Sequence, residues 1–154
     1  MKVRKMLLTL VALLVAAMVC FAADVNLGTW KLNEAKSKIS PGTGKNTSVV
    51  IAAVGDSVKV TVDGLGADGK PTHNEWTGKF DGKDYPWPGQ VNADTISLLR
   101  IDDEYYETIW KLKGEVTITS NTVVSKDGRT LTTTQSGKDA QGRTVLNMTV
   151  FDRQ

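Results

Sequence analysis

Short turns containing glycine divide the chain after residue 24 into segments too brief for long helices. The turn sequences are Gly55-Asp56, Asp68-Gly69-Lys70, Asp81-Gly82-Lys83, Lys113-Gly114-Glu115, Asp127-Gly128-Arg129 and Gln141-Gly142-Arg143. Each supplies a residue that tolerates the positive φ of a tight hairpin. Between the turns, apolar and polar residues alternate: Val58, Val60 and Val62 are separated by Lys59 and Thr61. This period of two is typical of half-buried strands, so the chain is predicted to be a series of hairpins.

The alternation predicts nine strands rich in Val, Ile and Thr. They are 28–33, 47–54, 57–63, 72–80, 95–101, 104–112, 116–125, 130–137 and 144–152. Residues 34–45 contain Pro41, Gly42 and Gly44 and are expected to form a loop with at most one helical turn, at Glu34–Lys38. Because no crossover helices separate the strands, a meander in a closed barrel or a sandwich is expected. We predict an all-β fold, a single antiparallel meander β-barrel of about 8–10 strands, since closure removes exposed edges.

The first 22 residues have the three parts of a secretion signal. Lys2, Arg4 and Lys5 precede an apolar stretch, and Cys20-Phe21-Ala22-Ala23 follows it. Small residues at Cys20 and Ala22 favour cleavage after Ala22, with cleavage after Ala23 as the other option. Val19 before the cysteine disfavours lipidation. An uncleaved anchor is the alternative, but the apolar stretch is close to the lower length limit for a membrane span. We therefore expect a periplasmic or secreted protein without a stable membrane anchor, its single domain at residues 23–154.

Loss of this signal changes the charge balance. Three of the 19 basic residues and none of the 17 acidic residues lie in residues 1–22, so the remaining chain carries a net charge of −1. No basic stripe remains, which argues against a nucleic-acid partner. The 132 residues after Ala22 are enough for one domain with one core. They contain no cysteine, so packing and sheet hydrogen bonds alone must hold the fold.

Gly28-Thr29-Trp30-Lys31-Leu32 resembles the first strand of the calycins, the superfamily of lipocalins and fatty-acid-binding proteins. Phe151-Asp152-Arg153 looks like the closing Tyr-Glu-Lys of many of those proteins. The resemblance implies that Gly28 begins the barrel and that Trp30 packs across its closed end. It also implies that Arg153 or Arg143 lies against the Trp30 ring. The chain looks closest to small secreted bacterial lipocalin-like proteins.

Two departures from that family bear on function. Residues 34–46 are too short for the helix-turn-helix that covers the cavity of fatty-acid-binding proteins. The Arg-x-Tyr pair that grips a fatty-acid carboxylate in that family corresponds here to Thr149 and Phe151. A buried carboxylate without a cationic partner is costly to desolvate, so a fatty-acid ligand is not expected.

The residues needed for common catalytic centres are missing from the sequence. His73 is the single histidine, and its strand parity places it with Glu75 and Lys79 on a wet face. Catalytic motifs of serine hydrolases and zinc proteases do not occur. The acidic clusters at Asp63–Asp68 and Asp102–Glu104 lack the ligand spacing of a calcium loop. We predict no enzyme activity, no metal and no cofactor.

Aromatic residues make up the candidate ligand site. Trp76, Phe80, Tyr106 and Trp110 share one strand face and line a pocket or simply fill the core. Tyr85 and Trp87 each precede a proline, which stiffens their segment, and are candidates for the pocket mouth. Arg100 shares parity with Ile96 and Leu98. It is either a buried cation that seeks an anionic group or a strand-end residue that reaches water.

Two classes of function follow from this sequence. The favoured one is an exported, monomeric carrier of a small apolar or amphipathic molecule, in which Trp76, Tyr106 and Trp110 line the pocket. The alternative is a protein-binding module, such as an inhibitor or an envelope-assembly factor, whose barrel core is filled. Interior volume separates the two, because a cavity of a few hundred cubic ångströms favours carriage.

Overall fold

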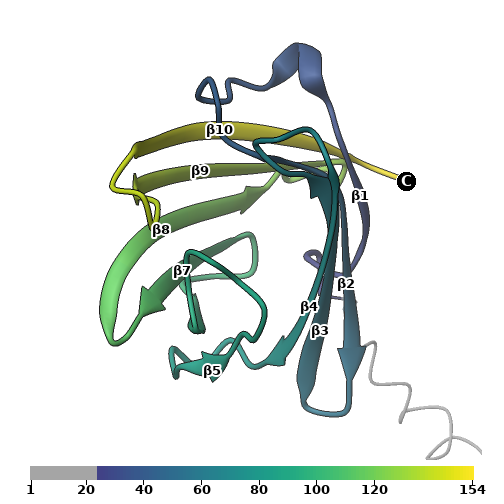
Figure 1. Cartoon of the computed structure of the whole chain (residues 1–154). Helices are drawn as coiled ribbons and strands as arrows, with labels where there is room; N and C mark the ends of the chain where they lie inside the picture. The colour runs from purple at the N-terminus through teal and green to yellow at the C-terminus, as the bar shows by residue number, and fades with distance from the viewer. Residues whose placement is uncertain (1–23) are drawn as a thin grey trace, which may run out of the picture.

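The computed structural model describes residues 24–154 as ten antiparallel strands that form one barrel (Figure 1). The predicted signal peptide and its cleavage site lie outside these residues. The strands are β1 (Gly28–Leu32), β2 (Lys45–Val54), β3 (Ser57–Leu65), β4 (Pro71–Gly78), β5 (Tyr85–Pro86), β6 (Thr95–Arg100), β7 (Tyr105–Leu112), β8 (Glu115–Val124), β9 (Thr130–Lys138) and β10 (Thr144–Arg153). A 3-10 turn, η1 (Glu34–Lys36), follows β1. Within residues 24–154, no helix is long and apolar enough to cross a membrane.

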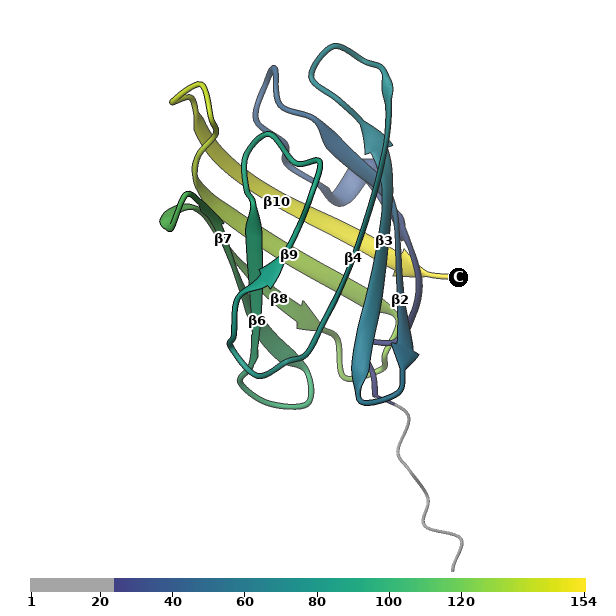
Figure 2. The ribbon, with the colours of Figure 1, turned by 60° about the horizontal axis from the view of Figure 1, so that its bottom comes forward.

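The sheet is a meander closed by its first and last strands. β1 pairs with β10, and the order runs β4-β3-β2-β1-β10-β9-β8-β7-β6-β5. The two strands at the ends of that order, β4 and β5, are not joined by backbone hydrogen bonds. The barrel is therefore closed everywhere except between these two strands. In Figures 1 and 2, β2, β3 and β4 lie on one side of the molecule and β7 to β10 curve around the other. The predicted all-β meander barrel is confirmed.

Nine of the strands match the segments expected from the sequence, with ends displaced by a few residues. The tenth, β5, is only two residues long and pairs Tyr85 with Ile96. Its Tyr-Pro sequence shows no alternation, so periodicity gave no signal for it. The predicted end of the fourth strand at Phe80 was wrong, since β4 ends at Gly78 and Phe80 lies outside the ladder.

Trp30 forms the core of the closed end of the barrel. Its side chain is fully buried, and its indole N–H donates to the Asn26 carbonyl at 3.0 Å. The Arg153 guanidinium lies over the Trp30 ring, 4.2 Å from the centroid. This contact is the one that the resemblance implied, and Arg153 rather than Arg143 makes it.

Arg153 also fastens three separate segments to one another. Its guanidinium donates to the carbonyls of Val25, Leu27 and Gly128, which belong to the N-terminal segment and the β8–β9 turn. Gly28 has φ of +138°, and a Cβ there would lie 2.5 Å from an Arg153 nitrogen. Glycine is favoured at position 28 because residues with a side chain rarely adopt this φ, and a Cβ would also displace the Arg153 guanidinium.

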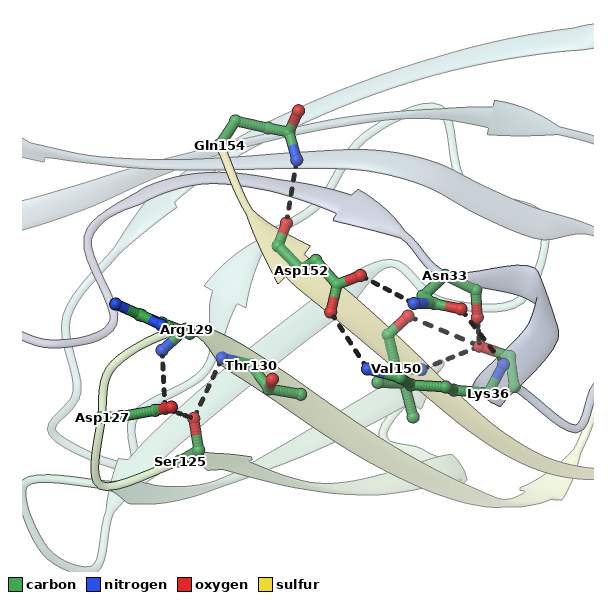
Figure 3. Close-up of polar contacts among 10 residues, drawn as sticks. Asn33, Lys36, Ser125, Asp127, Arg129, Thr130, Val150, Asp152 and Gln154 are labelled. Atoms are coloured by element: carbon green, nitrogen blue, oxygen red, sulfur yellow. Dashed lines mark hydrogen bonds and ion pairs between the residues drawn. The ribbon is translucent and has the colours of Figure 1, made fainter.

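The segment between β1 and β2 runs along β10 and not across the open end. Lys38 and Met148 exchange two backbone hydrogen bonds of 2.7 Å, and the Val150 amide donates to the Ser37 hydroxyl at 2.9 Å. Figure 3 shows Asn33 and Lys36 beside the Asp152 carboxylate, at 2.7 and 3.8 Å. This segment therefore continues the pairing that β1 begins, and only its last residues before β2, Thr43 and Gly44, reach the open end.

Candidate ligand chamber

Two adjoining chambers occupy the barrel interior and its open end. The inner chamber has a volume of about 140 Å³ and the outer one about 270 Å³. They share the side chains of five residues, at which they meet: Asn46, Asn74, Gln90, Trp110 and Gln135. Each chamber alone is smaller than the roughly 300–1,000 Å³ of typical small-molecule sites, but the two adjoining volumes together reach the lower part of that range.

The aromatic residues predicted to share one strand face line the inner chamber. Trp76 on β4 and Tyr106 and Trp110 on β7 point inward, as their even positions predicted, and Phe80 joins them from the segment after β4. Phe80 and Tyr106 meet edge-on with ring centroids 5.2 Å apart. Trp76 and Tyr106 are also part of the buried core, so these rings both pack and line the chamber.

The wall of the inner chamber carries no side chain that is charged at neutral pH. Its lining consists of aliphatic, aromatic, hydroxyl and amide residues, without Asp, Glu, Lys, Arg or His. Burial raises the pKa of Tyr106 to about 12, so its phenol is neutral. The charged residues Lys45, Asp139 and Arg143 line the outer chamber. There, Arg143 pairs with Asp139 at 2.6 Å and Lys45 with Glu34 at 2.7 Å.

Two polar groups of the inner chamber have no partner in the protein. The indole N–H of Trp87 and the hydroxyl of Ser120 are buried and make no hydrogen bond. Both residues line the inner chamber and are 5% and 3% exposed. Leaving a buried polar group unpaired costs about 1–3 kcal/mol. A ligand that satisfies these two groups recovers part of that cost.

The segment that was predicted to place Trp87 at the pocket mouth instead carries its ring inward. The Trp87 ring packs edge-on against Trp110, with centroids 5.0 Å apart, and its backbone N–H donates to the Asp94 carbonyl. The loop between Trp87 and Asp94, residues 88–93, borders the mouth of the outer chamber. Asn92 fixes it to the β9–β10 turn by accepting from the Ala140 N–H at 3.0 Å, and Gln90 bonds to Asn74 on β4. Trp87 thus lies below the mouth, not at it.

Tyr85 and Arg100 line neither chamber. Tyr85 bridges the opening between β4 and β5: its ring packs against Gly78, where a Cβ would meet it at 2.9 Å, and its hydroxyl donates to Asp81. Arg100, at the end of β6, pairs with Asp24 and lies 4.3 Å from the Phe80 ring centroid. Burial of Asp24 opposes its ionisation, but hydrogen bonds from Arg100 and Asn26 outweigh it and hold the pKa of Asp24 below its usual value. The Arg100 charge is therefore already compensated within the protein.

His73 lies on the exposed face of β4, as its parity predicted. Its Nδ1 is 2.7 Å from an Asp63 carboxylate oxygen, and the side chain is 62% exposed. Among residues 24–154, no three His, Cys, Asp or Glu side chains converge as a metal site would require.

Sequence reasoning missed the hydroxyl and amide residues of the chamber. Ser120, Thr122 and Gln135 lie on strands that were predicted, but their inward direction was not used. The signal was available, because Ile118, Ser120, Thr122 and Val124 alternate with exposed or half-buried residues on β8.

Comparison with known proteins finds similar solved structures but no related sequence. No family model and no curated protein matches the sequence. Among solved structures, the chain is similar to the zebrafish ileal bile acid-binding protein in complex with cholic acid, with 12% identity and a TM-score of 0.46. The match covers 84% of this chain and 99% of that one. The barrel assignment rests on the sheet order itself.

Proposed function

We propose that this protein is an exported carrier that holds one small, neutral, amphipathic molecule inside its barrel. One observation carries the proposal: the inner chamber combines aromatic rings and aliphatic side chains with two unpaired buried polar groups and has no charged side chain. Aromatic rings offer large apolar contact at low entropic cost. A neutral ligand enters such a chamber without the desolvation penalty that an unpaired charge would meet.

The same chamber argues against a free carboxylate as the bound group. Thr149 and Phe151 occupy the positions of the family's cationic clamp, and Phe151 is buried in the core. The nearest cations of the outer chamber, Lys45 and Arg143, already have carboxylate partners. An anionic ligand would have to break one of these pairs or remain uncompensated.

A matched pair of ligands tests this selectivity. Decanol is expected to bind at least roughly tenfold more tightly than decanoate at pH 8, because only the acid carries an unpaired charge into the chamber. Tryptophan fluorescence can follow the titration, since Trp76, Trp87 and Trp110 line the inner chamber and Trp30 serves as a distant, constant contribution.

Two variants give the controls for this titration. Val62→Phe places a larger side chain in the inner chamber and should abolish the decanol response, whereas Thr77→Phe, on the exposed face of β4, should leave it unchanged. Equal or tighter binding of decanoate would contradict the selectivity. If neither compound binds, the protein-binding module becomes the better explanation.

Export is the second part of the proposal and rests on the N-terminal sequence. Lys2, Arg4 and Lys5, the apolar stretch after them and the small residues at Cys20 and Ala22 form the signal. The exported protein is expected to begin at Ala23 or Asp24, which intact-mass analysis of periplasmic and medium fractions measures. A mass that retains residues 1–22, or a lipid adduct on Cys20, would show this part to be wrong.

A further inference from the structure

The interior of β7 to β10 carries two rows of polar side chains that run across four neighbouring strands. Cross-strand pairing sets both rows, because directly paired residues point to the same face. The lower row is Tyr106, Thr122, Thr133 and Thr149. The upper row is Thr108, Ser120, Gln135 and Asn147. All eight line the inner or the outer chamber, and together they form what we call the polar band.

Apolar rows enclose the polar band above and below. The next paired row toward the open end is Trp110, Ile118, Gly137 and Val145, and the next toward the closed end contains Val124, Leu131 and Phe151. The polar residues are therefore confined to two adjacent rows of the barrel wall. Six of the eight line the inner chamber, and Asn147 and Thr149 on β10 line the outer one.

The opposite side of the same chamber is mainly aliphatic on β2 and β3, with Asn46 and Asn74 at its junction with the outer chamber. Val49 and Ile51 on β2 and Val60 and Val62 on β3 line it, and we call these four the aliphatic wall. β3 lies five strands from β8 in the sheet order, which places the two walls on opposite sides of a ten-stranded barrel. Figures 1 and 2 show β2 and β3 across the interior from β8 and β9. The chamber is thus lined mainly by polar side chains on one side and mainly by aliphatic side chains on the other.

Hydrogen bonds within the polar band leave capacity for a ligand. Thr122 and Thr133 share one hydrogen bond of 3.0 Å, and Asn147 accepts from the Ser40 amide at 2.8 Å. Ser120, at the centre of the upper row, has no partner. A wholly apolar occupant would cover the Ser120 hydroxyl without pairing it, which is unfavourable.

We infer that the ligand of this chamber is facially amphipathic: a compact neutral molecule with hydroxyl or keto groups along one face and hydrocarbon on the other. The polar face lies on the polar band with an oxygen at Ser120, and the hydrocarbon face lies on the aliphatic wall. This inference rests on the proposed function and adds to it the ligand's class and its orientation. A head-and-tail molecule places its polar group at one end, whereas this chamber offers polar partners along one side.

Two stereoisomers of a trans-decalin diol test the inference, one with both hydroxyls on the same face and one with hydroxyls on opposite faces. The two have the same composition and ring skeleton, so the comparison tests how the hydroxyls are arranged. The same-face isomer is expected to bind roughly tenfold more tightly, the equivalent of about one hydrogen bond. Isothermal titration calorimetry measures both affinities on the protein as exported.

Ser120→Ala links that difference to the polar band. Because the Ser120 hydroxyl has no protein partner, its removal leaves the fold intact and should remove most of the preference between the isomers. Ser136→Ala makes the same chemical change on the exposed face of β9 and should preserve the preference. Equal affinities for both isomers, or a preference that Ser120→Ala leaves unchanged, would overturn the inference while decanol binding keeps the carrier function. Failure of both the diols and decanol to bind would overturn the carrier function itself.

Discussion

Replacing Trp30 by alanine is expected to lower the free energy of unfolding by about 3–5 kcal/mol. Trp30 is fully buried, so the substitution removes a large ring and leaves a cavity at the closed end. It also removes the donor to the Asn26 carbonyl and the surface on which Arg153 lies. Small domains are stable by only about 5–15 kcal/mol, so the loss is a large share of the total.

Urea denaturation with circular dichroism measures this loss as a shift of the midpoint at constant slope. Trp30→Phe provides the matched variant, because it keeps an aromatic surface under Arg153 but has no N–H for Asn26. Its cost should be clearly smaller than that of Trp30→Ala. An unchanged midpoint in Trp30→Ala would contradict the packing of the closed end.

Trp30 also shows how far the sequence could predict this fold. A five-residue motif near the start of the barrel indicated a closed end with an arginine over the tryptophan. The sequence did not decide whether Arg153 or Arg143 makes this contact, since it gives no distance between segments. Strand register decides the matter: Trp30 pairs directly with Arg153, whereas Arg143 pairs with Asp139 at the open end.

The candidate site was predictable where it depended on alternation. Trp76, Tyr106 and Trp110 lie on regular strands, so their parity gave their direction. Tyr85 and Trp87 lie where no period exists, and the two prolines beside them restrict the backbone without fixing a side. Trp87 turns inward because its ring packs on Trp110 and Asp94 accepts its backbone N–H, both of which are tertiary contacts.

The polar band could not be predicted from the sequence, for a different reason. Its rows exist only when β7, β8, β9 and β10 pair in one register, and a register shift between Trp110 and Lys111 separates the upper β7–β8 pairs from those of the band. Sequence alone could not show that Thr122 and Thr133 would lie beside Ser120 and Tyr106 on neighbouring strands.

Gly137→Ala is expected to destabilise the barrel by about 2–5 kcal/mol, through backbone strain and overpacking together. Gly137 has φ of +150°, a conformation that residues with a side chain rarely adopt. An added Cβ would lie 2.0 Å from the Thr117 carbonyl oxygen and 2.8 Å from the Ile118 Cα. Both are backbone atoms of β8, so the clash can be relieved only if β8 and β9 move apart.

Gly55→Ala separates the two causes of that cost. Gly55 also has positive φ, +61°, but no atom lies within 4 Å of the position of its Cβ, so this variant should lose only about 1–2 kcal/mol from strain. Both losses are measured by urea denaturation. Because Gly137 belongs to the row directly above the polar band, separation of β8 from β9 should also weaken binding of the same-face diol, which Gly55→Ala should not do. Equal losses of unfolding free energy in the two variants would contradict the close approach of β8 and β9, on which the alignment of the polar band depends.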